Sequence, residues 1–206
     1  MSRPLSSEDV AAFRARLCAV AEQLFAEHGV ENVGIRQLAQ ALGCSPMTPY
    51  RYFRDKDEIL AATRAAAFDR FAAALEAAAA AATAQDQLGA VGGAYVRFAL
   101  DEPNAYRLMF DLAQPDEARF PDLGRAGMRA RRTMTAYLET LIAAGAIQGD
   151  AVLLGHVFWA AIHGAISLQL AGKLNDGPDF ATVQHELFRL LLRGAAFAPS
   201  SGSAPI

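Results

Sequence analysis

The stretch of sequence that decides the fold is Gly34–Lys56, which reads GIRQLAQALGCSPMTPYRYFRDK. Its first apolar residues recur at intervals of three or four and stop at Gly43, which predicts a short helix ended by a left-handed glycine. Ser45 followed by Pro46 has the pattern of an N-cap and a first helical residue. We therefore expect two short helices joined by a tight turn, which is a helix-turn-helix.

The second of these helices carries side chains suited to contact with DNA. We expect Tyr50 and Phe53 on its inner face and hydroxyl groups and Arg51 toward the outside. Hydroxyls can bind phosphate, and an arginine can bind guanine through two hydrogen bonds. The candidate DNA contacts are Arg36, Pro46, Met47, Thr48, Tyr50, Arg51, Tyr52 and Lys56. The alternative, a plain helical hairpin inside a core, does not explain so many polar groups on one short motif.

The composition excludes several classes of protein. The chain has 206 residues, 53% hydrophobic and 20% charged, which is enough apolar material for a sizeable core. A formal net charge of −3 argues against binding nucleic acid over the whole surface. Cys18 and Cys44 are too few for a disulfide framework, and we expect buried, inert thiols. The sequence indicates no cofactor, no metal site and no catalytic centre. Because no catalytic centre is indicated, we do not expect an enzyme. The start of the chain has no apolar run, so we expect a cytoplasmic protein.

The periodicity of the whole chain predicts an all-α fold, because no segment alternates as a strand does. We expect a first helix from Ser6 or Ser7 to Gly29 and a longer helix from Asp55 to about Ala82. The apolar stripe of the first helix consists of Val10, Phe13, Leu17, Val20 and Leu24. Further helices are expected at residues 85–100, 103–112, 123–145, 150–172 and 179–194.

The expected organisation is an N-terminal three-helix DNA-binding domain followed by a second helical domain. The boundaries are 1–55 for the helix-turn-helix domain, 56–195 for the second helical domain, and 196–206 for a disordered tail. Residues 151–172 hold no formally charged side chain and are long enough to span a bilayer. Two histidines and three glycines within them favour a helix packed between its own domain and a partner subunit, with no membrane contact.

Taken together, these motifs resemble the TetR family of transcriptional regulators. The resemblance lies in an N-terminal helix followed by I-x-x-L-A-x-x-L-G-x-S-x-x-T-x-Y-x-Y-F-x-x-K and all-helical sequence. Residues 158–164, FWAAIHG, are similar to the W-x-x-x-H-G signature of one C-terminal subgroup. Two positions depart from the family. Gly34 replaces a Thr or Ser, and Pro49 replaces an aliphatic residue, so the recognition helix is expected to start late or to be partly 3₁₀.

The resemblance implies that residues 56–195 form a ligand-binding and dimerisation domain. It also implies a homodimeric repressor of a near-palindromic operator, with recognition helices roughly 34–36 Å apart. A small hydrophobic or aromatic effector would release the DNA, and the helix from Lys56 is the expected lever. The expected effector contacts are Phe98, Phe110, Tyr137, Trp159 and His163. The expected dimer contacts are His156, Phe158, Ile162, Phe188, Leu191 and Leu192. The alternative is a helical small-molecule-binding protein or enzyme with a vestigial helix-turn-helix, which Gly34 and Pro49 favour. An activator, or a regulator without a ligand, is a third interpretation.

Overall fold

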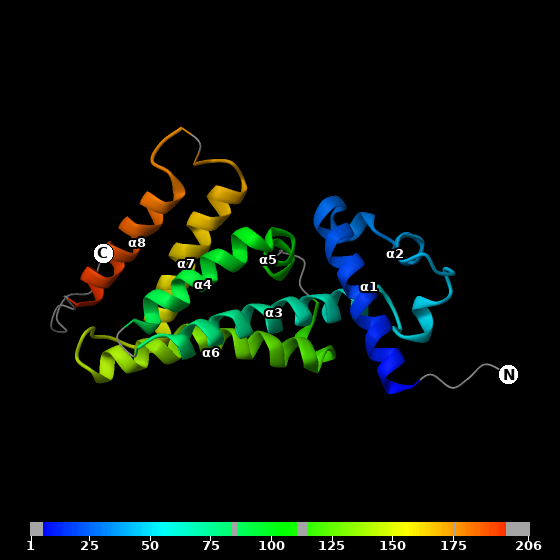
Figure 1. Ribbon diagram of the computed structural model, residues 1–206, viewed down its shortest axis with the longest axis horizontal. Helices are drawn as coiled ribbons and strands as arrows, with labels where there is room; N and C mark the ends of the chain where they lie inside the picture. The colour runs from blue at the N-terminus through cyan, green and yellow to red at the C-terminus, as the bar shows by residue number, and fades with distance from the viewer. Residues whose placement is uncertain (1–5, 84–85, 111–114, 175, 197–206) are drawn as a thin grey trace. The chain divides into compact units, whose positions relative to one another are not determined.

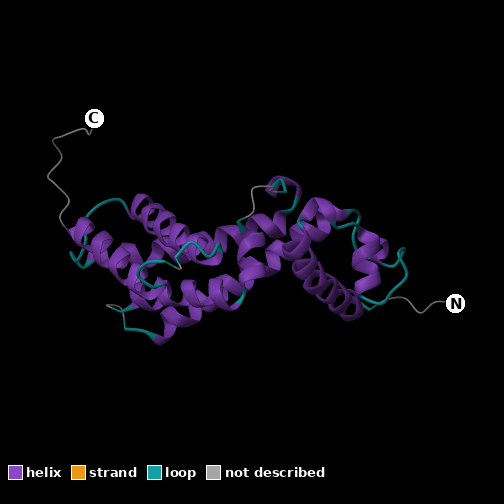
Figure 2. Cartoon of the chain, turned by 90° about the horizontal axis from the view of Figure 1, so that it is seen from above, coloured by secondary structure: helices purple, strands orange, loops and turns teal. Residues whose placement is uncertain are grey.

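A computed structural model describes residues 6–83, 86–110, 115–174 and 176–196 of the chain (Figure 1). In these ranges all regular elements are helical, so the predicted all-α class is confirmed (Figure 2). The α-helices are α1 (Ser7–His28), α2 (Ile35–Ala41), α3 (Lys56–Ala81), α4 (Gln87–Asp101), α5 (Pro103–Met109), α6 (Pro121–Ala143), α7 (Ala151–Leu170) and α8 (Phe180–Ala196). The 3₁₀ helices are η1 (Val30–Asn32), η2 (Pro49–Arg51) and η3 (Glu117–Arg119).

The chain forms two compact units, each drawn from two segments. Unit 1 consists of Met1–Ala72 and Glu102–Ala130, and unit 2 consists of Ala73–Asp101 and Arg131–Ile206. α3 and α6 each supply residues to both units. The functional boundary between residues 55 and 56 stays a prediction. Of the expected tail, only Ala196 is described, as the last residue of α8.

α1 begins and ends at the residues that its sequence predicts. The Ser6 hydroxyl accepts a hydrogen bond from the Asp9 N–H (3.0 Å), and the Asp9 carboxylate accepts one from the Ser6 N–H (3.2 Å). This reciprocal pair is a capping box. At the other end Gly29 has φ +81°, and its N–H donates to the Phe25 carbonyl (2.9 Å). The helix therefore begins and ends at local signals that do not depend on packing elsewhere.

The buried face of α1 is rotated from the predicted stripe. Only Leu17 of that stripe is fully covered, whereas Phe13, Val20 and Leu24 are half-buried and Val10 is near the start of the helix. The buried residues are Leu17, Cys18, Ala21 and Phe25. α1 packs against α2 and α5, and the small side chain of Ala21 permits this close packing. The predicted stripe was chosen by its large apolar residues, and the buried face also includes the small residues Cys18 and Ala21.

Unit 2 is built around α7. The Asp150 carboxylate caps this helix by accepting from the Leu153 N–H (2.7 Å), and α7 packs against α4 and α8. α7 contains an 18-residue stretch that is long and apolar enough to cross a membrane, with a mean hydropathy of 1.7, and 28% of this stretch is buried in the chain. Length and composition alone do not separate a spanning helix from a core helix. The large apolar side chains that α7 leaves exposed are Val152, Leu153, Val157 and Leu168.

Candidate functional site

Glycines stand at both ends of α2, and the one at its C-terminal end forms the turn of the predicted helix-turn-helix. Gly43 has φ +73°, the left-handed conformation that ends a helix, and the Cys44 N–H donates to the Ala39 carbonyl (2.9 Å). At the start of α2, the Gln37 side chain accepts from the Gly34 N–H (2.7 Å). Gly34 therefore caps α2 together with Gln37, and its departure from the family pattern leaves the helix start intact.

Residues 46–52, which follow the turn and are called the recognition segment here, contain a single 3₁₀ turn in place of a full α-helix. The Thr48 N–H donates to the Ser45 carbonyl (2.8 Å), and the Tyr52 N–H donates to the Pro49 carbonyl (2.9 Å). Both bonds span three residues, which is the 3₁₀ pattern. Pro49 has no N–H to contribute, and its place at the start of η2 confirms the prediction that it would make this segment partly 3₁₀.

The exposed side of this segment presents most of the predicted DNA contacts. Met47 is 69% exposed and Tyr50 is 50% exposed, while Pro46 and Arg51 are exposed as well. Arg36 is exposed on α2, and Thr48 is half-buried. The prediction that Tyr50 lies on the inner face is wrong. Pro49 is buried there instead, because a 3₁₀ turn has three residues per turn and shifts the faces of the helix.

Two further predicted contacts have structural partners. Tyr52 was expected on the outer side, which is wrong, because its half-buried ring stacks on Phe13 at 3.9 Å between centroids. Lys56 is half-buried, and its ammonium group donates to the Val30 carbonyl (2.8 Å). This bond fixes the first residue of α3 to η1. The charge of Lys56 therefore stays at the N-terminus of α3, where the helix dipole also favours anions.

Arg14 on α1 braces the recognition segment, although the sequence did not identify it. Its guanidinium donates to the Glu58 carboxylate (3.1 Å) and to the Tyr52 carbonyl, and it lies 4.0 Å from the centroid of the Phe53 ring. Glu58 also accepts from the Arg54 N–H (2.9 Å). Burial raises the pKa of Glu58, but hydrogen bonds from Arg54 and Arg14 outweigh it and hold that pKa below its usual value. These partners lie 38 and 44 residues from Arg14, so no local pattern could have indicated them.

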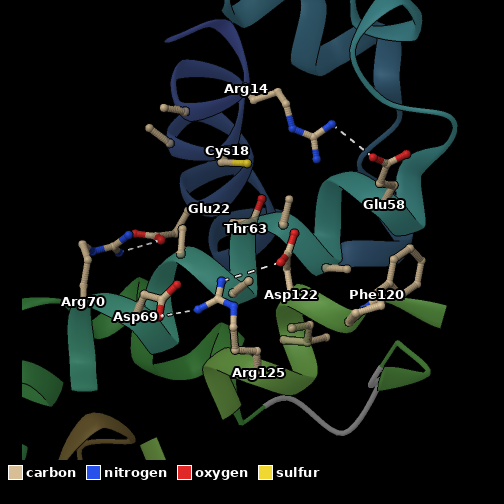
Figure 3. Close-up of a pocket in the computed structure, with 18 of the residues that line it drawn as sticks. Arg14, Cys18, Glu22, Glu58, Thr63, Asp69, Arg70, Phe120, Asp122 and Arg125 are labelled. Carbon is tan, nitrogen blue, oxygen red and sulfur yellow. Dashed lines mark hydrogen bonds and ion pairs between the residues drawn. The ribbon is translucent and has the colours of Figure 1, made fainter. Parts of the chain in front are cut away.

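A charged cleft of about 800 Å³ lies in unit 1 between α1, α3 and the start of α6 (Figure 3). Ion pairs join its walls. Arg70 of α3 pairs with Glu22 of α1 (2.8 Å), and Arg125 of α6 lies 3.5 Å from Asp69 of α3. With the pair of Arg14 and Glu58, these contacts tie α1 to α3 and α3 to α6. Cys18 lines the same cleft, and burial raises the pKa of its thiol, which keeps it protonated.

Unit 2 contains a small apolar cavity of about 50 Å³. Among the described residues that line it, none is charged. They are Leu75, Leu88, Val91, Gly92, Tyr95, Thr133, Met134, Leu138, Gly155, Phe158, Trp159, Ile162 and Phe188. The Trp159 indole N–H donates to the Tyr95 hydroxyl (3.1 Å), so two polar groups of the lining satisfy one another.

The structure does not bring all five predicted effector contacts together. Trp159 lines the cavity. Phe98 is buried, and Phe110 belongs to unit 1, where its ring centroid is 5.0 Å from that of Tyr106. Tyr137 is half-buried, and burial together with Glu76 raises its pKa. His163 is half-buried beside Trp159, with 6.3 Å between ring centroids, and burial lowers its pKa.

The predicted dimer contacts fall into two groups. Phe158 and Ile162 are 7% and 4% exposed, so their own unit already covers them. His156 is exposed on α7, with its Nδ1 2.7 Å from the Val152 carbonyl, and the remaining residues are half-buried on α8. Those remaining residues are Phe188, Leu191 and Leu192. The described residues also contain no candidate metal site, because no three His, Cys, Asp or Glu side chains are grouped among them.

A helix-turn-helix with a second helical unit is the architecture of a DNA-binding regulator, and two family models match these two parts of the chain. The model of bacterial regulatory proteins of the tetR family matches residues 17–63, and the tetracyclin repressor-like C-terminal domain matches residues 88–195. The second match covers more than half of the chain. The chain therefore belongs to the TetR family, whose members are transcriptional regulators and not enzymes.

Individual relatives agree with this assignment. An HTH-type transcriptional regulator of Staphylococcus aureus strain USA300 is 41% identical over 46 residues, 22% of this chain and 25% of that protein. The chain thus matches about a quarter of the length of such curated relatives. A protein of unknown function from Rhodococcus sp. RHA1 is 30% identical with a TM-score of 0.77, over 95% of this chain and 100% of that one. The TetR family regulator PfmR from Thermus thermophilus, 24% identical over 86% of this chain and 97% of its own, shares the fold with a TM-score of 0.69.

Proposed function

We propose that the chain is a cytoplasmic, ligand-responsive repressor that binds a near-palindromic operator as a homodimer. The observation that carries this proposal is the recognition segment, where Met47, Tyr50 and Arg51 are exposed on a turn that Arg14 holds from behind. Exposed aromatic, hydroxyl and guanidinium groups on a braced turn suit the major groove. They have no comparable role in packing the unit that carries them.

Each contact has a defined role in this proposal. Arg51 reads a guanine through its two parallel N–H groups, which specifies sequence. The Tyr50 hydroxyl and the Lys56 ammonium bind phosphates, which set the register of the protein on the duplex. Arg36 on α2 adds a second basic contact. A single 3₁₀ turn offers few contacts, so tight and specific binding requires two copies on two half-sites.

The homodimer is proposed to form through α7 and α8. Val152 and Leu153 on α7 are 54% and 63% exposed, and Leu190 on α8 is 56% exposed. Such apolar side chains on neighbouring helices are typical of an interface. His156, Leu191 and Leu192 remain part of this proposal. Phe188, also predicted as a dimer contact, is half-buried and lines the cavity, and Phe158 and Ile162 lie beneath the face. Burying the face against a second copy gives a four-helix contact.

The effector is proposed to bind in unit 2 and to act by shifting the spacing of the two recognition segments. A ligand changes an equilibrium only by its differential affinity for the two states. α3 supplies residues to both units, and its ion pairs with α1 offer a route by which a shift reaches the helix-turn-helix. We also propose that Trp159, His163 and Gly164 place the chain in the W-x-x-x-H-G subgroup.

The test is an electrophoretic mobility shift with the intergenic DNA upstream of the protein's own gene. Tyr50→Ala and Lys56→Ala should weaken binding to all sequences, and Arg51→Ala should also relax sequence preference. Arg97→Ala makes the same change at an exposed position of α4 in unit 2 and should bind as the wild type does. Unchanged affinity in all three site variants would contradict the assignment. If the helix-turn-helix were vestigial, no specific complex would form with any variant. Gly34 and Pro49, the two residues that favour this alternative, both fit their places in the fold, at the starts of α2 and η2.

A further inference from the structure

Phe188 extends from the surface of unit 2 to its apolar cavity. The side chain is half-buried on α8, and it lines the cavity together with Leu88, Gly92 and Phe158. Its ring centroid lies 6.1 Å from that of Phe158. Leu88 and Gly92 are also half-buried, so this part of the lining is close to the surface. One aromatic side chain thus touches both the cavity and the outside.

Gly92 on α4 makes room for the tip of this ring. A Cβ atom at residue 92 would lie 2.8 Å from Cζ and 3.2 Å from Cε1 of Phe188, closer than carbon atoms pack. Gly92 lies inside a helix without a positive φ, where alanine would be more favourable for the backbone. The absence of a side chain at residue 92 is therefore explained by the ring that rests on it.

The cavity is too small for an effector while the ring is in place. Its volume is about 50 Å³. An apolar cavity that takes up benzene measures about 150 Å³, and sites for larger ligands begin near roughly 300 Å³. The site must therefore enlarge before it binds. Withdrawal of the half-buried Phe188 ring enlarges it without separating the fully buried side chains of α4, α6 and α7.

The lining also defines the chemistry of the ligand. The Tyr95 hydroxyl and the Trp159 N–H are bonded to each other, and the hydroxyl of Thr133 is the remaining side-chain polar group among the described lining residues. An ionised carboxylate or ammonium would lose its hydration here without gaining a charged partner. The cavity therefore selects a neutral ligand with an aromatic or aliphatic body and at most one polar group.

We propose that Phe188 is a plug, which a neutral aromatic effector displaces and replaces against Gly92. This inference rests on the proposed function, in which unit 2 holds the effector. Leu190, two residues further along α8, is 56% exposed on the face proposed for the dimer. The plug and the proposed subunit contact therefore lie on the same helix, which offers a link between occupancy of the cavity and the geometry of the dimer.

The experiment compares two fluorescent probes on the full chain. N-phenyl-1-naphthylamine is neutral, and 1-anilinonaphthalene-8-sulfonate carries the same rings with a negative charge. Phe188→Ala should bind the neutral probe about tenfold more tightly than the wild type, because a site open in a small fraction of molecules loses affinity by that fraction. Phe188→Leu, which keeps an apolar side chain but no ring, should bind with intermediate affinity. Neither variant should gain affinity for the anionic probe.

Phe180→Ala is the matched control, since Phe180 is a half-buried phenylalanine of the same helix that does not line the cavity. Equal affinity of the neutral probe for the wild type, Phe188→Leu and Phe188→Ala would overturn the plug, as would an equal gain in Phe180→Ala. Mobility shifts with the same preparations separate the two proposals. Specific DNA binding with no gain in probe affinity contradicts the plug alone, whereas absence of specific DNA binding by the wild type contradicts the proposed function.

Discussion

Replacing Arg14 by methionine should loosen the recognition segment while leaving α1 helical. Methionine keeps the aliphatic stem and the helix propensity of arginine but removes the guanidinium. The substitution therefore deletes the hydrogen bonds to the Tyr52 carbonyl and to Glu58, and the contact with the face of Phe53. Glu58 keeps its hydrogen bonds from Arg54, so no carboxylate is left without a partner.

The expected loss follows from the exposure of the groups. Arg14 is 34% exposed and Glu58 is 19% exposed, so their pair lies between a surface and a buried interaction. Surface pairs contribute about 0–1 kcal/mol and buried charged hydrogen bonds about 1.5–3 kcal/mol, which gives about 1.5 kcal/mol here after allowing for solvent screening. The contact with Phe53 adds about 0.5 kcal/mol. The local opening free energy of the segment should fall by about 2 kcal/mol.

Hydrogen exchange at the amides of Tyr52 and Phe53 measures this quantity directly, because both donate to the Pro49 carbonyl. A loss of 2 kcal/mol in opening free energy accelerates exchange by about thirtyfold when reclosing is faster than exchange from the open state, and DNA affinity should fall by up to about tenfold. Arg16→Met is the control, as Arg16 is exposed on the same helix. Exchange rates within about threefold of the wild type in Arg14→Met would refute the bracing role.

Three further predictions concern the turn after α2, the proposed dimer interface and the half-buried His163. Gly43→Ala should lower the free energy of unfolding by about 1–2 kcal/mol in urea titrations, because φ is +73° there. Gly89→Ala, at a helical position with open space, should raise this free energy by up to about 1 kcal/mol. Equal effects of the two substitutions would contradict the conformational explanation. Leu153→Asp should convert the dimer to a monomer in sedimentation, and Met128→Asp, exposed on α6, should not; a dimer in both would exclude the proposed face. Burial lowers the pKa of His163, so the unfolded chain takes up the proton first, and stability is lost as pH falls from the unfolded value of about 6.5 toward the lower folded pKa. The fall in Tm between about pH 7.5 and pH 5.5 should be smaller in His163→Gln, and an unchanged fall would contradict this.

Local signals in the sequence account for the helices and their ends. The capping residues Ser6 and Asp9 start α1, and Gly29 and Gly43 end helices through left-handed backbone, so these boundaries could be predicted without any knowledge of packing. Pro49 also acts locally, and its 3₁₀ turn was expected. Which side chains then face inward depends on the actual number of residues per turn, which the sequence does not give.

Contacts between residues far apart in the chain could not be predicted from a single sequence. Tyr52 turned inward because Phe13 offers a ring to stack on, and Arg14 braces the segment across 38 residues. The effector residues show the same limit. Aromatic residues were spread over several helices, and only packing shows that Phe110 belongs to unit 1 while Trp159 lines the cavity of unit 2.

The most direct test of the central claim is a selection of the purified protein on a random pool of double-stranded DNA, followed by titration of the enriched sequence. A near-palindromic sequence should emerge, with an affinity that falls between about 50 mM and 200 mM salt and survives excess nonspecific competitor. Arg51→Ala should enrich a less restricted base at one position of each half-site. A pool without any enriched sequence, from a preparation that is folded and dimeric, would contradict sequence-specific DNA binding by this chain.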